Sequence, residues 1–556
     1  MEWTMRDVKM LLLLIVFSAM AVSCKKNETT SEPKAFRFVT LNVNGVNDGF
    51  SYSQLNTKPV VSITFSEPID NNSISQAVSF KTATSSAVEF NTSLENNNTT
   101  LRIEPTVDLE GFAKYSVTVS KELKSTAGGT LESPVNVSLT ISLDSTDKFE
   151  RISDDDLLTL VQRQTFKYFW DFAHPVSGLA RERESSGDVV TSGGSGFGVM
   201  AILAAISRGF VTREEGLARM QKIVGFLKND AETFHGAYPH WLNGATGEAV
   251  AFSEKDNGAD LVETSYLIQG LLAARQFFSG AGTDEATLRN DINTIWNNVE
   301  WDWFTKGGED VLYWHWSPDF EWEMNHPVRG WNECLITYVL AASSTTHTIS
   351  KTVYDNGWAQ QGAMANNSIY YGHRLPLGPA FGGPLFFAHY SFLGLNPNGL
   401  QDAYANYWEQ NVAHALINYN YCVDNPENHA GYSSAVWGLT ASDNQDGYSA
   451  HAPGNDLGVI SPTAALSSFP YTPEQSMEAL NFFYYKLGDK IWKEYGFVDA
   501  FNLNIPWVAN SFLAIDQGPI IIMIENYRSG LLWQLFMSSP EVKAGITKLG
   551  FTSPAL

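Results

Sequence analysis

Residues 253–278 read SEKDNGADLVETSYLIQGLLAARQFF, an apolar helical pattern with acidic residues at its start. Asp256, Asp260 and Glu263 are spaced i, i+4 and i+7, which places them within an arc of roughly 60° on one helix face. The other faces are apolar, so we expect most of this helix to be buried. Like charges in such a place resist desolvation, and catalytic sites use that effect to separate carboxyl pKa values. A solvated first turn that complements the helix dipole would show the same spacing.

Helical periodicity extends over residues 150–556. Ser153 is followed by three aspartates and a long apolar run, which is typical of a capped helix start. Further helices are predicted at residues 197–208, 213–228, 258–279, 285–299, 330–344, 401–420, 473–491 and 518–537. The segments between them are rich in glycine, proline, histidine and aromatic residues. Many helices joined by long loops fit an α/α toroid, in which the loops gather at one end of the barrel.

Residues 36–146 differ in composition and are rich in Val, Thr, Ser and Asn. Alternating runs such as VVSITF, KYSVTVS and VNVSLTISL, separated by turn residues, predict a small antiparallel sandwich. The runs PVVSITFSEPID and KYSVTVSKELKSTAGG resemble bacterial Ig-like domains of surface proteins. The stretch holds no cluster of histidine, cysteine or acidic residues that suggests chemistry, so we interpret it as a spacer or docking module.

The first residues predict a secretion signal. The run MLLLLIVFSAMAVS has the length of a signal core and is too short to span a bilayer comfortably. Ala21-Val22-Ser23-Cys24 resembles a bacterial lipobox, which implies removal of residues 1–23 and lipidation of Cys24. Polar residues 24–35 predict a flexible tether. We therefore expect membrane contact only through the lipid, with the protein in the periplasm or at the outer membrane or cell surface.

Charge and cysteine content narrow the function classes. The chain carries 60 acidic and 36 basic residues, a formal net charge of −24, which argues against binding nucleic acid or anionic lipid. Aromatic residues make up 13% of the chain, with 16 Trp, and such rings suit stacking on sugars. Cys334 and Cys422 lie in apolar runs and are expected to be buried free thiols.

Three further segments could hold catalytic groups. In VRGWNECLITYVL, Glu333 opens an apolar helix, where it is either a general acid with a raised pKa or a capping residue. The loop WGLTASDNQDGYSAHAPGND carries Asp443 among small residues that let a backbone approach a ligand. In FLAIDQGPIIIMIENYRSGLLW, Asp516, Glu525 and Arg528 interrupt a very apolar run, which indicates a structural ion pair first and a substrate contact second.

The sequence lacks the motifs that are typical of several other enzyme classes. The sequence contains no HExxH or CxxC spacing and no GxSxG, so a zinc enzyme or a serine hydrolase is not expected. Neither a metal nor an organic cofactor is predicted. The glycine run SGGSGFG at residues 192–198 has no lysine and, on the sequence, no preceding strand, so it does not predict a phosphate-binding loop.

Ordered motifs across residues 150–553 resemble one family. They are FKYFWDFAHPVSGLARER, SGGSGFG, DNGADLVETSYLIQGLL, RGWNECLITYVLAASS, YYGHRLPLG, WGLTASD and IDQGPIIIMIENYRSGLLW. They are similar to the glycoamylase-like bacterial proteins, and most of all to glycoside hydrolase family 144, the β-1,2-glucanases. The resemblance implies a mainly α protein, an (α/α)6 barrel preceded by the small all-β Ig-like sandwich. It also implies inverting hydrolysis of β-1,2-glucan or sophorooligosaccharides without a cofactor.

The resemblance also assigns site residues. The family's acidic residues map onto Asp256, Asp260, Glu263, Glu333 and Asp443. The chain departs from the family at Asn444-Gln445, where the family pattern has Gly-Pro, which puts the shape of that loop in doubt.

An inverting glycosidase needs an acid and a base with carboxyl groups about 6.5–9.5 Å apart. Glu333 is the expected acid, and the base stays open between Asp443 and the helix acids. The residues expected to bind substrate are His240, Trp241, Trp316, Arg329, Trp331, Tyr371 and Arg374. The alternatives are a glucoamylase-type or β-glucosidase-type hydrolase of another linkage, and a non-catalytic glycan-binding lipoprotein.

Overall fold

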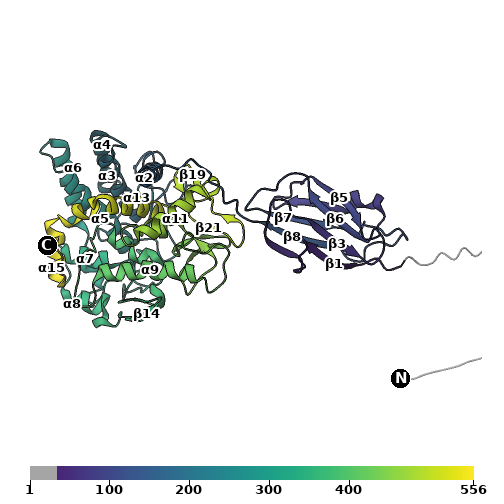
Figure 1. Cartoon of the computed structure of the whole chain (residues 1–556). Helices are drawn as coiled ribbons and strands as arrows, with labels where there is room; N and C mark the ends of the chain where they lie inside the picture. Colours follow the sequence, from purple (N-terminus) through teal and green to yellow (C-terminus); the bar gives the residue numbers. More distant parts are fainter. Residues whose placement is uncertain (1–33) are drawn as a thin grey trace, which may run out of the picture. The chain divides into compact units, whose positions relative to one another are not determined.

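The computed structural model describes residues 34–556, which divide after Ile141 into two units. The predicted signal peptide, Cys24 and nearly all of the tether lie outside the described residues. Within the described range, no helix has the length and apolarity needed to cross a bilayer. Figure 1 shows the first unit as a sandwich of strands and the second as a bundle of helices.

The first unit is a β-sandwich, as predicted, but it is not wholly antiparallel, because the strand Ser51–Leu55 pairs in parallel with the strand Val135–Ile141. One sheet has the order β1 (Phe38–Val43), β3 (Val61–Phe65), β6 (Thr100–Pro105), β5 (Phe90–Glu95), and the other β2 (Ser51–Leu55), β8 (Val135–Ile141), β7 (Lys114–Val119), β4 (Val78–Thr82). A single-turn helix, α1 (Ile74–Ala77), lies before β4. Val61, Ile63 and Phe65 alternate with less buried residues along β3, as expected where one face of a sheet packs on the core. The two inner faces form one apolar core, separate from that of the second unit.

The second unit is an α/α barrel. Along residues 142–556, six pairs of an outer and an inner element follow one another. The outer elements are α2 (Asp154–Trp170), α4 (Arg213–Asn229), α6 (Thr283–Asn298), α8 with η3 (Lys351–Val353, Tyr354–Trp358), α9 (Tyr407–Asp424) and α11 (Pro473–Tyr485). The inner elements are α3 (Ser192–Ser207), α5 (Leu261–Phe277), α7 (Leu335–Ser343), η6 with η7 (Leu385–Ala388, Tyr390–Leu393), α10 (Pro462–Leu466) and α13 (Ala514–Ser529).

Burial and packing separate the inner from the outer ring. Inner helices such as α3 and α5 are buried on nearly every side, whereas outer helices such as α2 and α4 bury one face. In the inner ring, α3 contacts α5 and α13, α5 contacts α7, and η7 contacts both α7 and α13. The final helices α14 (Leu531–Met537) and α15 (Pro540–Leu549) pack on α5 and α7. Cys334 and Cys422 are buried free thiols, as predicted.

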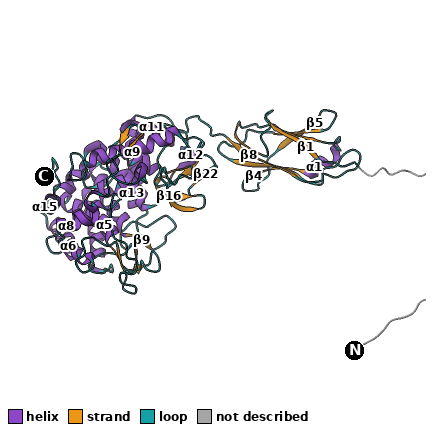
Figure 2. Ribbon diagram, turned by 90° about the horizontal axis from the view of Figure 1, so that it is seen from below, coloured by secondary structure: helices purple, strands orange, loops and turns teal. Residues whose placement is uncertain are grey.

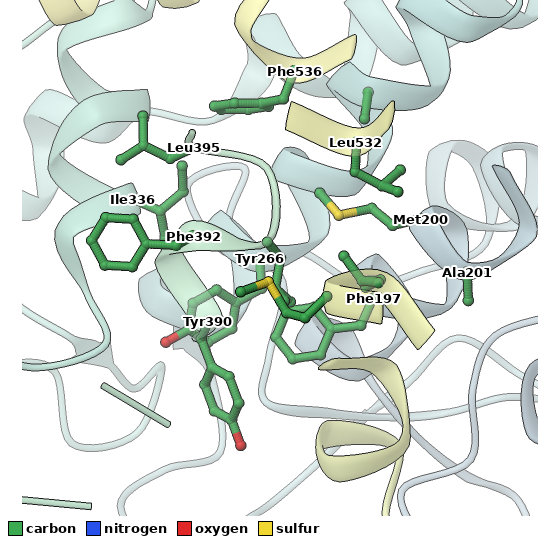
Figure 3. Packing of buried hydrophobic residues seen from close by; sticks show 14 of the residues in the cluster. Phe197, Met200, Ala201, Tyr266, Ile336, Tyr390, Phe392, Leu395, Leu532 and Phe536 are labelled. Carbon is green, nitrogen blue, oxygen red and sulfur yellow. The ribbon is translucent and has the colours of Figure 1, made fainter. Parts of the chain in front are cut away.

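The glycine run 192–198 forms the first two turns of α3 and lets α5 approach closely. A Cβ on Gly196 would lie 2.2 Å from the carbonyl oxygen of Tyr266, and one on Gly270 would lie 2.3 Å from the carbonyl oxygen of Gly196. A three-residue strand, β9 (Val189–Thr191), precedes the run, which corrects the expectation that none would. Figure 3 shows Phe197, Tyr266 and Tyr390 of neighbouring inner elements meeting in the core.

The connections that precede the inner helices are long and those that follow them are mostly short. The long ones are residues 171–191, 230–260, 299–334, 359–384, 425–461 and 486–513. Short pieces of structure lie in them: β10 (Trp241–Asn243), β11 (Ala249–Val250), β12 (Ala259–Asp260), η2 (Trp301–Thr305), β13 (His315–Trp316), η4 (Gln360–Gly362), β14 (Ile369–Tyr370), β15 (His373–Arg374), η5 (Ala380–Gly382), β16 (Ala441–Asn444), β17 (Gly447–Ala450), β18 (Val459–Ile460), α12 (Gly488–Ile491), β19 (Trp492–Lys493), β20 (Gly496–Phe497), β21 (Phe501–Asn502) and β22 (Trp507–Val508). Because the inner helices run parallel, the long connections gather at their N-terminal ends.

Candidate active site

Asp260 is the N-cap of α5 and the centre of a buried polar cluster. Its Oδ1 accepts hydrogen bonds from the backbone N–H groups of Val262 (3.0 Å) and Glu263 (2.9 Å), and its Oδ2 lies 3.0 Å from Nδ1 of His240. Burial by itself raises the pKa of Asp260, but the hydrogen bond from His240 and the charges of His315 and His240 lower it below its usual value. Asp260 is therefore an ionised carboxylate inside the protein.

Glu263 lies in the first turn of α5 and bridges to α3. Its Oε2 accepts a hydrogen bond of 2.8 Å from the backbone N–H of Gly193 and one of 3.4 Å from the hydroxyl of Thr191. A Cβ at position 193 would lie 2.3 Å from that oxygen, so only glycine leaves room for this contact. Burial raises the pKa of Glu263, against the lowering effect of the His240 charge.

Two histidines, His240 and His315, compensate the negative charges of Asp256, Asp260 and Glu263. His315 Nδ1 lies 3.4 Å from Oδ1 of Asp256 and 3.8 Å from Oδ2 of Asp260. Burial lowers the pKa of His240, but the charges of Glu263, Asp260 and Asp256 and the hydrogen bond to Asp260 outweigh it and raise the value to about 9. The pKa of His315 is also raised by the same kind of contacts. The cluster is therefore an ion-paired network rather than a set of repelling acids.

The helix itself begins later than predicted. α5 starts at Leu261, so Asp256 lies before it, in a turn where its N–H donates to the carbonyl of Ser253. The cause is local: the Asp260 side chain caps the helix, and Ala259–Asp260 pairs as β12 with His315–Trp316. The acids still converge, through the two histidines. His240, Asp256 and Asp260 bring three ligand atoms within 4.8 Å, but the imidazole–carboxylate contacts already use them, and we assign no metal.

Glu333 precedes α7 at the same end of the barrel. The amide of Cys334 donates to Oδ1 of Asn332 (3.0 Å), whereas the carboxyl of Glu333 accepts from the backbone N–H of Glu333 itself. The carbonyl of Glu333 accepts hydrogen bonds from the hydroxyls of Ser391 and Tyr266, which fix its backbone. Burial raises the pKa of the Glu333 carboxyl to about 7, and the charges of Glu263 and Asp260 add to this. Glu333 is thus an acid that holds its proton near neutrality.

Asp443, on β16, belongs to a second carboxylate group. Arg183 Nη1 lies 3.4 and 3.3 Å from its two oxygens, and the hydroxyl of Ser511 donates to Oδ2. Its backbone N–H donates to Oδ2 of Asp499 at 2.6 Å. Asp443 is therefore an ion-paired carboxylate whose oxygens are both engaged.

Behind Asp443 lies a buried carboxyl pair that the sequence analysis did not assemble. Asp499 and Asp516 are each 2% exposed and hydrogen-bonded to one another. Burial raises the pKa of Asp499 to about 7, and burial together with the neighbouring Asp499 raises that of Asp516 well above its usual value. Two carboxyls in contact cannot both ionise, so the pair shares a proton. An aspartate inside the apolar run GFVDAF was the available signal for Asp499.

Acids of both carboxylate groups act on one tyrosine, Tyr390. Burial raises the pKa of Tyr390, and the charges of Asp516, Glu333 and Glu263 each raise it further. Glu333, Glu263 and Asp516 lie at the N-terminal ends of α7, α5 and α13, three elements of the same inner ring. The acids therefore form one site, at the end of the barrel where the long connections gather.

The predicted substrate-binding residues separate into two groups. His240 lies in the cluster, and Trp241 lies beside it, with its ring 4.9 Å from that of the half-exposed Phe252. Trp316 follows His315 and packs on Trp303 at 5.4 Å.

The remaining predicted binding residues are Arg329, Trp331, Tyr371 and Arg374. Trp331 is 5% exposed and packs on Phe392, so its ring has no free face for a sugar, which corrects that prediction. Arg329 is exposed, close in sequence to Glu333. Tyr371 and Arg374 lie on the exposed β14–β15 turn, where Arg374 bonds Asn367.

The far end of the barrel holds the predicted structural ion pair. Buried Glu525 pairs with Arg208 at 2.6 and 3.0 Å, and Arg528 pairs instead with Asp155 at 2.6 Å. A cavity of about 890 Å³ lies there, but its arginines are already matched by acids. Asp516, nine residues earlier on α13, belongs to the opposite end.

Comparison with known proteins agrees with this fold. A glycoamylase family model, described as "Putative glucoamylase", matches residues 325–540, and a bacterial Ig-like domain model matches residues 48–141. The structure of an endo-β-1,2-glucanase from Chitinophaga pinensis, with sophorotriose and glucose, is 55% identical, covers 73% of this chain and 100% of that chain, and has a TM-score of 0.72. A β-1,2-glucanase from Parabacteroides distasonis is 40% identical, with coverage of 93% and 73% and a TM-score of 0.70.

A curated relative gives a similar result over a smaller share of its length. It is an exo β-1,2-glucooligosaccharide sophorohydrolase (non-reducing end) from Parabacteroides distasonis, 48% identical over 420 residues. The match covers 72% of this chain, which spans only 58% of that relative. Fold and carboxyls together define an α/α-barrel glycoside hydrolase. The chain belongs to the glycoamylase-like proteins of glycoside hydrolase family 144, with a bacterial Ig-like domain before the barrel.

Proposed function

We propose that this protein hydrolyses β-1,2-glucan or sophorooligosaccharides. The observation that carries the proposal is a set of buried carboxyls at one end of the barrel: Glu333, with a pKa of about 7, lies at the same end as the Asp499–Asp516 pair, while Asp260 is ionised. Carboxyls driven to different protonation states are the requirement of glycoside hydrolysis. The similarity to β-1,2-glucanases at 55% and 40% identity supports this linkage over an α-glucan.

Glu333 is the general acid in this proposal. At neutral pH a large fraction of its carboxyl is protonated, so it can deliver a proton to the glycosidic oxygen as the bond breaks. An unperturbed glutamate, with a pKa near 4.3, would be ionised. A glycan-binding protein without catalysis would have no use for a carboxyl held neutral in this way.

The base comes from the Asp499–Asp516 pair. A pair that shares one proton contains one carboxylate, and such pairs activate water in other hydrolases. Asp260 is a poor alternative because it is fully buried and committed to the helix cap and His240. Asp443 is a poor alternative because Arg183 and Ser511 occupy its oxygens. Asp256, Asp260 and Glu263 instead form the ion-paired network with His240 and His315.

The stereochemistry of the first product tests this assignment. With inversion, proton NMR of full-length protein and β-1,2-glucan detects the α-anomer first, followed by mutarotation. E333Q and D516N each lose about 100-fold or more in kcat while the melting temperature is retained. Wild-type-like turnover by E333Q, or β-anomer appearing first, would reject the acid or the inverting mechanism.

We also propose that Cys24 carries a lipid that anchors the protein in the periplasm or at the cell surface. The lipobox-like residues 21–24 and the polar stretch after them support it. Cells expressing the full chain and fed labelled palmitate incorporate label into wild type but not into C24S. Label in both, or in neither, contradicts the anchor.

A further inference from the structure

Another cavity, outside the active site, lies where α5, α6 and α15 meet. Its volume is about 470 Å³, within the range of about 300–1,000 Å³ typical of small-ligand sites. Its lining includes Arg275 of α5, Arg289 and Trp296 of α6, and Glu541 of α15. Figure 1 and Figure 2 both show α6 and α15 on the same side of the barrel unit. Arg275 follows Glu263 by about 18 Å along the axis of α5, so the cavity is separate from the catalytic carboxyls.

The charged side chains that line this cavity leave one positive charge unbalanced. The charges of Arg275 and Glu541 cancel, because Nη1 and Nη2 of the arginine donate to the two carboxylate oxygens at 3.1 and 2.8 Å. Arg289 is different: its Nη1 donates to two backbone carbonyls, and no carboxylate of residues 34–556 forms an ion pair with it. Glu285 interacts with the charge of Arg289 but is already paired with Arg213 at 2.8 Å. The cavity is therefore a positive spot on a strongly acidic protein.

The neutral side chains of the cavity add hydrogen-bond donors. Trp296 is 1% exposed, and its indole Nε1 is buried without a hydrogen-bond partner. A buried N–H group normally meets an acceptor, so an unpaired one beside a cavity indicates a ligand. Asn293 also lines the cavity, and its Oδ1 accepts from Nη1 of Arg275 at 2.7 Å, which leaves its NH2 group for a ligand. Nε and Nη2 of Arg289 are donors as well. The group that fits here is an acceptor.

We propose that this cavity binds a small oxyanion, a carboxylate or a phosphate. The oxygens of the anion accept hydrogen bonds from the indole of Trp296, the amide of Asn293 and the guanidinium of Arg289, and its charge balances that of Arg289. A neutral sugar could accept the same hydrogen bonds but would leave the charge of Arg289 unbalanced. The site is independent of the proposed hydrolysis of glucan, because none of its residues belongs to the carboxyl groups at the other end of the barrel.

Calorimetry of the full-length protein with inorganic phosphate and, separately, with malonate at constant ionic strength tests the site. We expect one anion bound per chain, and the tighter of the two probes identifies a phosphate site or a carboxylate site. W296F keeps an aromatic ring but removes the indole N–H, so we expect about tenfold weaker binding. The matched control is W301F, because Trp301 is also fully buried with an unpartnered Nε1 but does not line the cavity. W301F should bind the anion as wild type does.

Arg289 is tested by its charge. R289Q should abolish measurable binding, whereas R289K keeps the charge and should retain part of it. Both changes remove donors to the end of α5, so melting temperatures without anion are measured first, and if R289Q does not fold, the comparison of W296F with W301F decides. Equal affinities for W296F and wild type, or equal losses in W296F and W301F, would overturn the site. Absence of any binding to wild type would overturn it too, with water as the partner of Trp296. Turnover of β-1,2-glucan by W296F should stay at the level of wild type.

Discussion

At the scale of single residues, environment decides what each carboxyl can do. Asp260 and Glu333 lie in the same polar end of the barrel, yet one has a lowered pKa and the other a pKa raised to about 7. The difference is that Asp260 receives hydrogen bonds from two backbone amides and His240, whereas burial dominates at Glu333. Composition alone could not distinguish these two acids, because neither the histidine partner nor the burial can be read from a motif.

The raised pKa of Glu333 predicts an alkaline limit to activity. The acid must be protonated, so ionisation of Glu333 lowers kcat/KM as pH rises through about 7, whereas ionisation of Asp499, whose pKa is also raised to about 7, limits activity on the acid side. The measurement is kcat/KM on β-1,2-glucan from pH 5 to pH 9. An alkaline limb that stays above pH 9 would contradict the assignment of Glu333.

The raised pKa of Glu333 also predicts how the stability of the folded protein changes with pH. The folded-state pKa of Glu333 is above its unfolded value, so the stabilisation is complete below about 4.5 and is lost as pH rises through about 7. E333Q cannot ionise, so its melting temperature relative to wild type increases between pH 5 and pH 8. A constant difference across that range would show that Glu333 does not titrate in the folded protein.

At the scale of elements, close approach of α3 and α5 fixes the site. Gly193 lets the backbone reach Glu263, and Gly196 lets the two helices touch. The sequence predicted both helices and the acids, but α5 starts at Leu261 because Asp260 caps it and β12 pairs with β13. Asp499 and Asp516 are 17 residues apart in the sequence and meet only because the long connection 486–513 folds back over α13, which no local pattern reveals.

Gly196→Ala tests the helix contact. The added methyl would lie 2.2 Å from a backbone carbonyl that cannot move aside, so we expect a loss of about 1–3 kcal/mol or more in the free energy of unfolding. The matched control is Gly225→Ala in outer helix α4, where the new Cβ meets no atom within 4 Å. That change should stabilise the protein by about 0.4–1 kcal/mol. Urea unfolding measures the free energy of unfolding of both variants. Equal values for Gly196→Ala and Gly225→Ala would contradict the close packing of α3 on α5.

At the scale of the whole molecule, the protein has two separate hydrophobic cores. The sandwich and the barrel each have their own buried cluster, and every catalytic candidate lies within residues 142–556. The Chitinophaga pinensis chain is covered in full by 73% of this one, and residues 142–556 form a compact unit of their own.

Residues 142–556 produced alone should therefore fold and keep the kcat of the full chain on soluble β-1,2-glucan within about twofold. Circular dichroism melting and initial rates measure both properties. A folded fragment with kcat lowered tenfold would show that the Ig-like unit contributes to catalysis. The full-length protein is the control for both.

The most direct test of the central claim is product analysis of full-length protein with linear β-1,2-glucan, beside starch and laminarin, with E333Q as the inactive control. We predict sophorooligosaccharides or sophorose from β-1,2-glucan alone, and no product from E333Q. Sugar released from starch or laminarin, with β-1,2-glucan left intact, would contradict the proposed substrate.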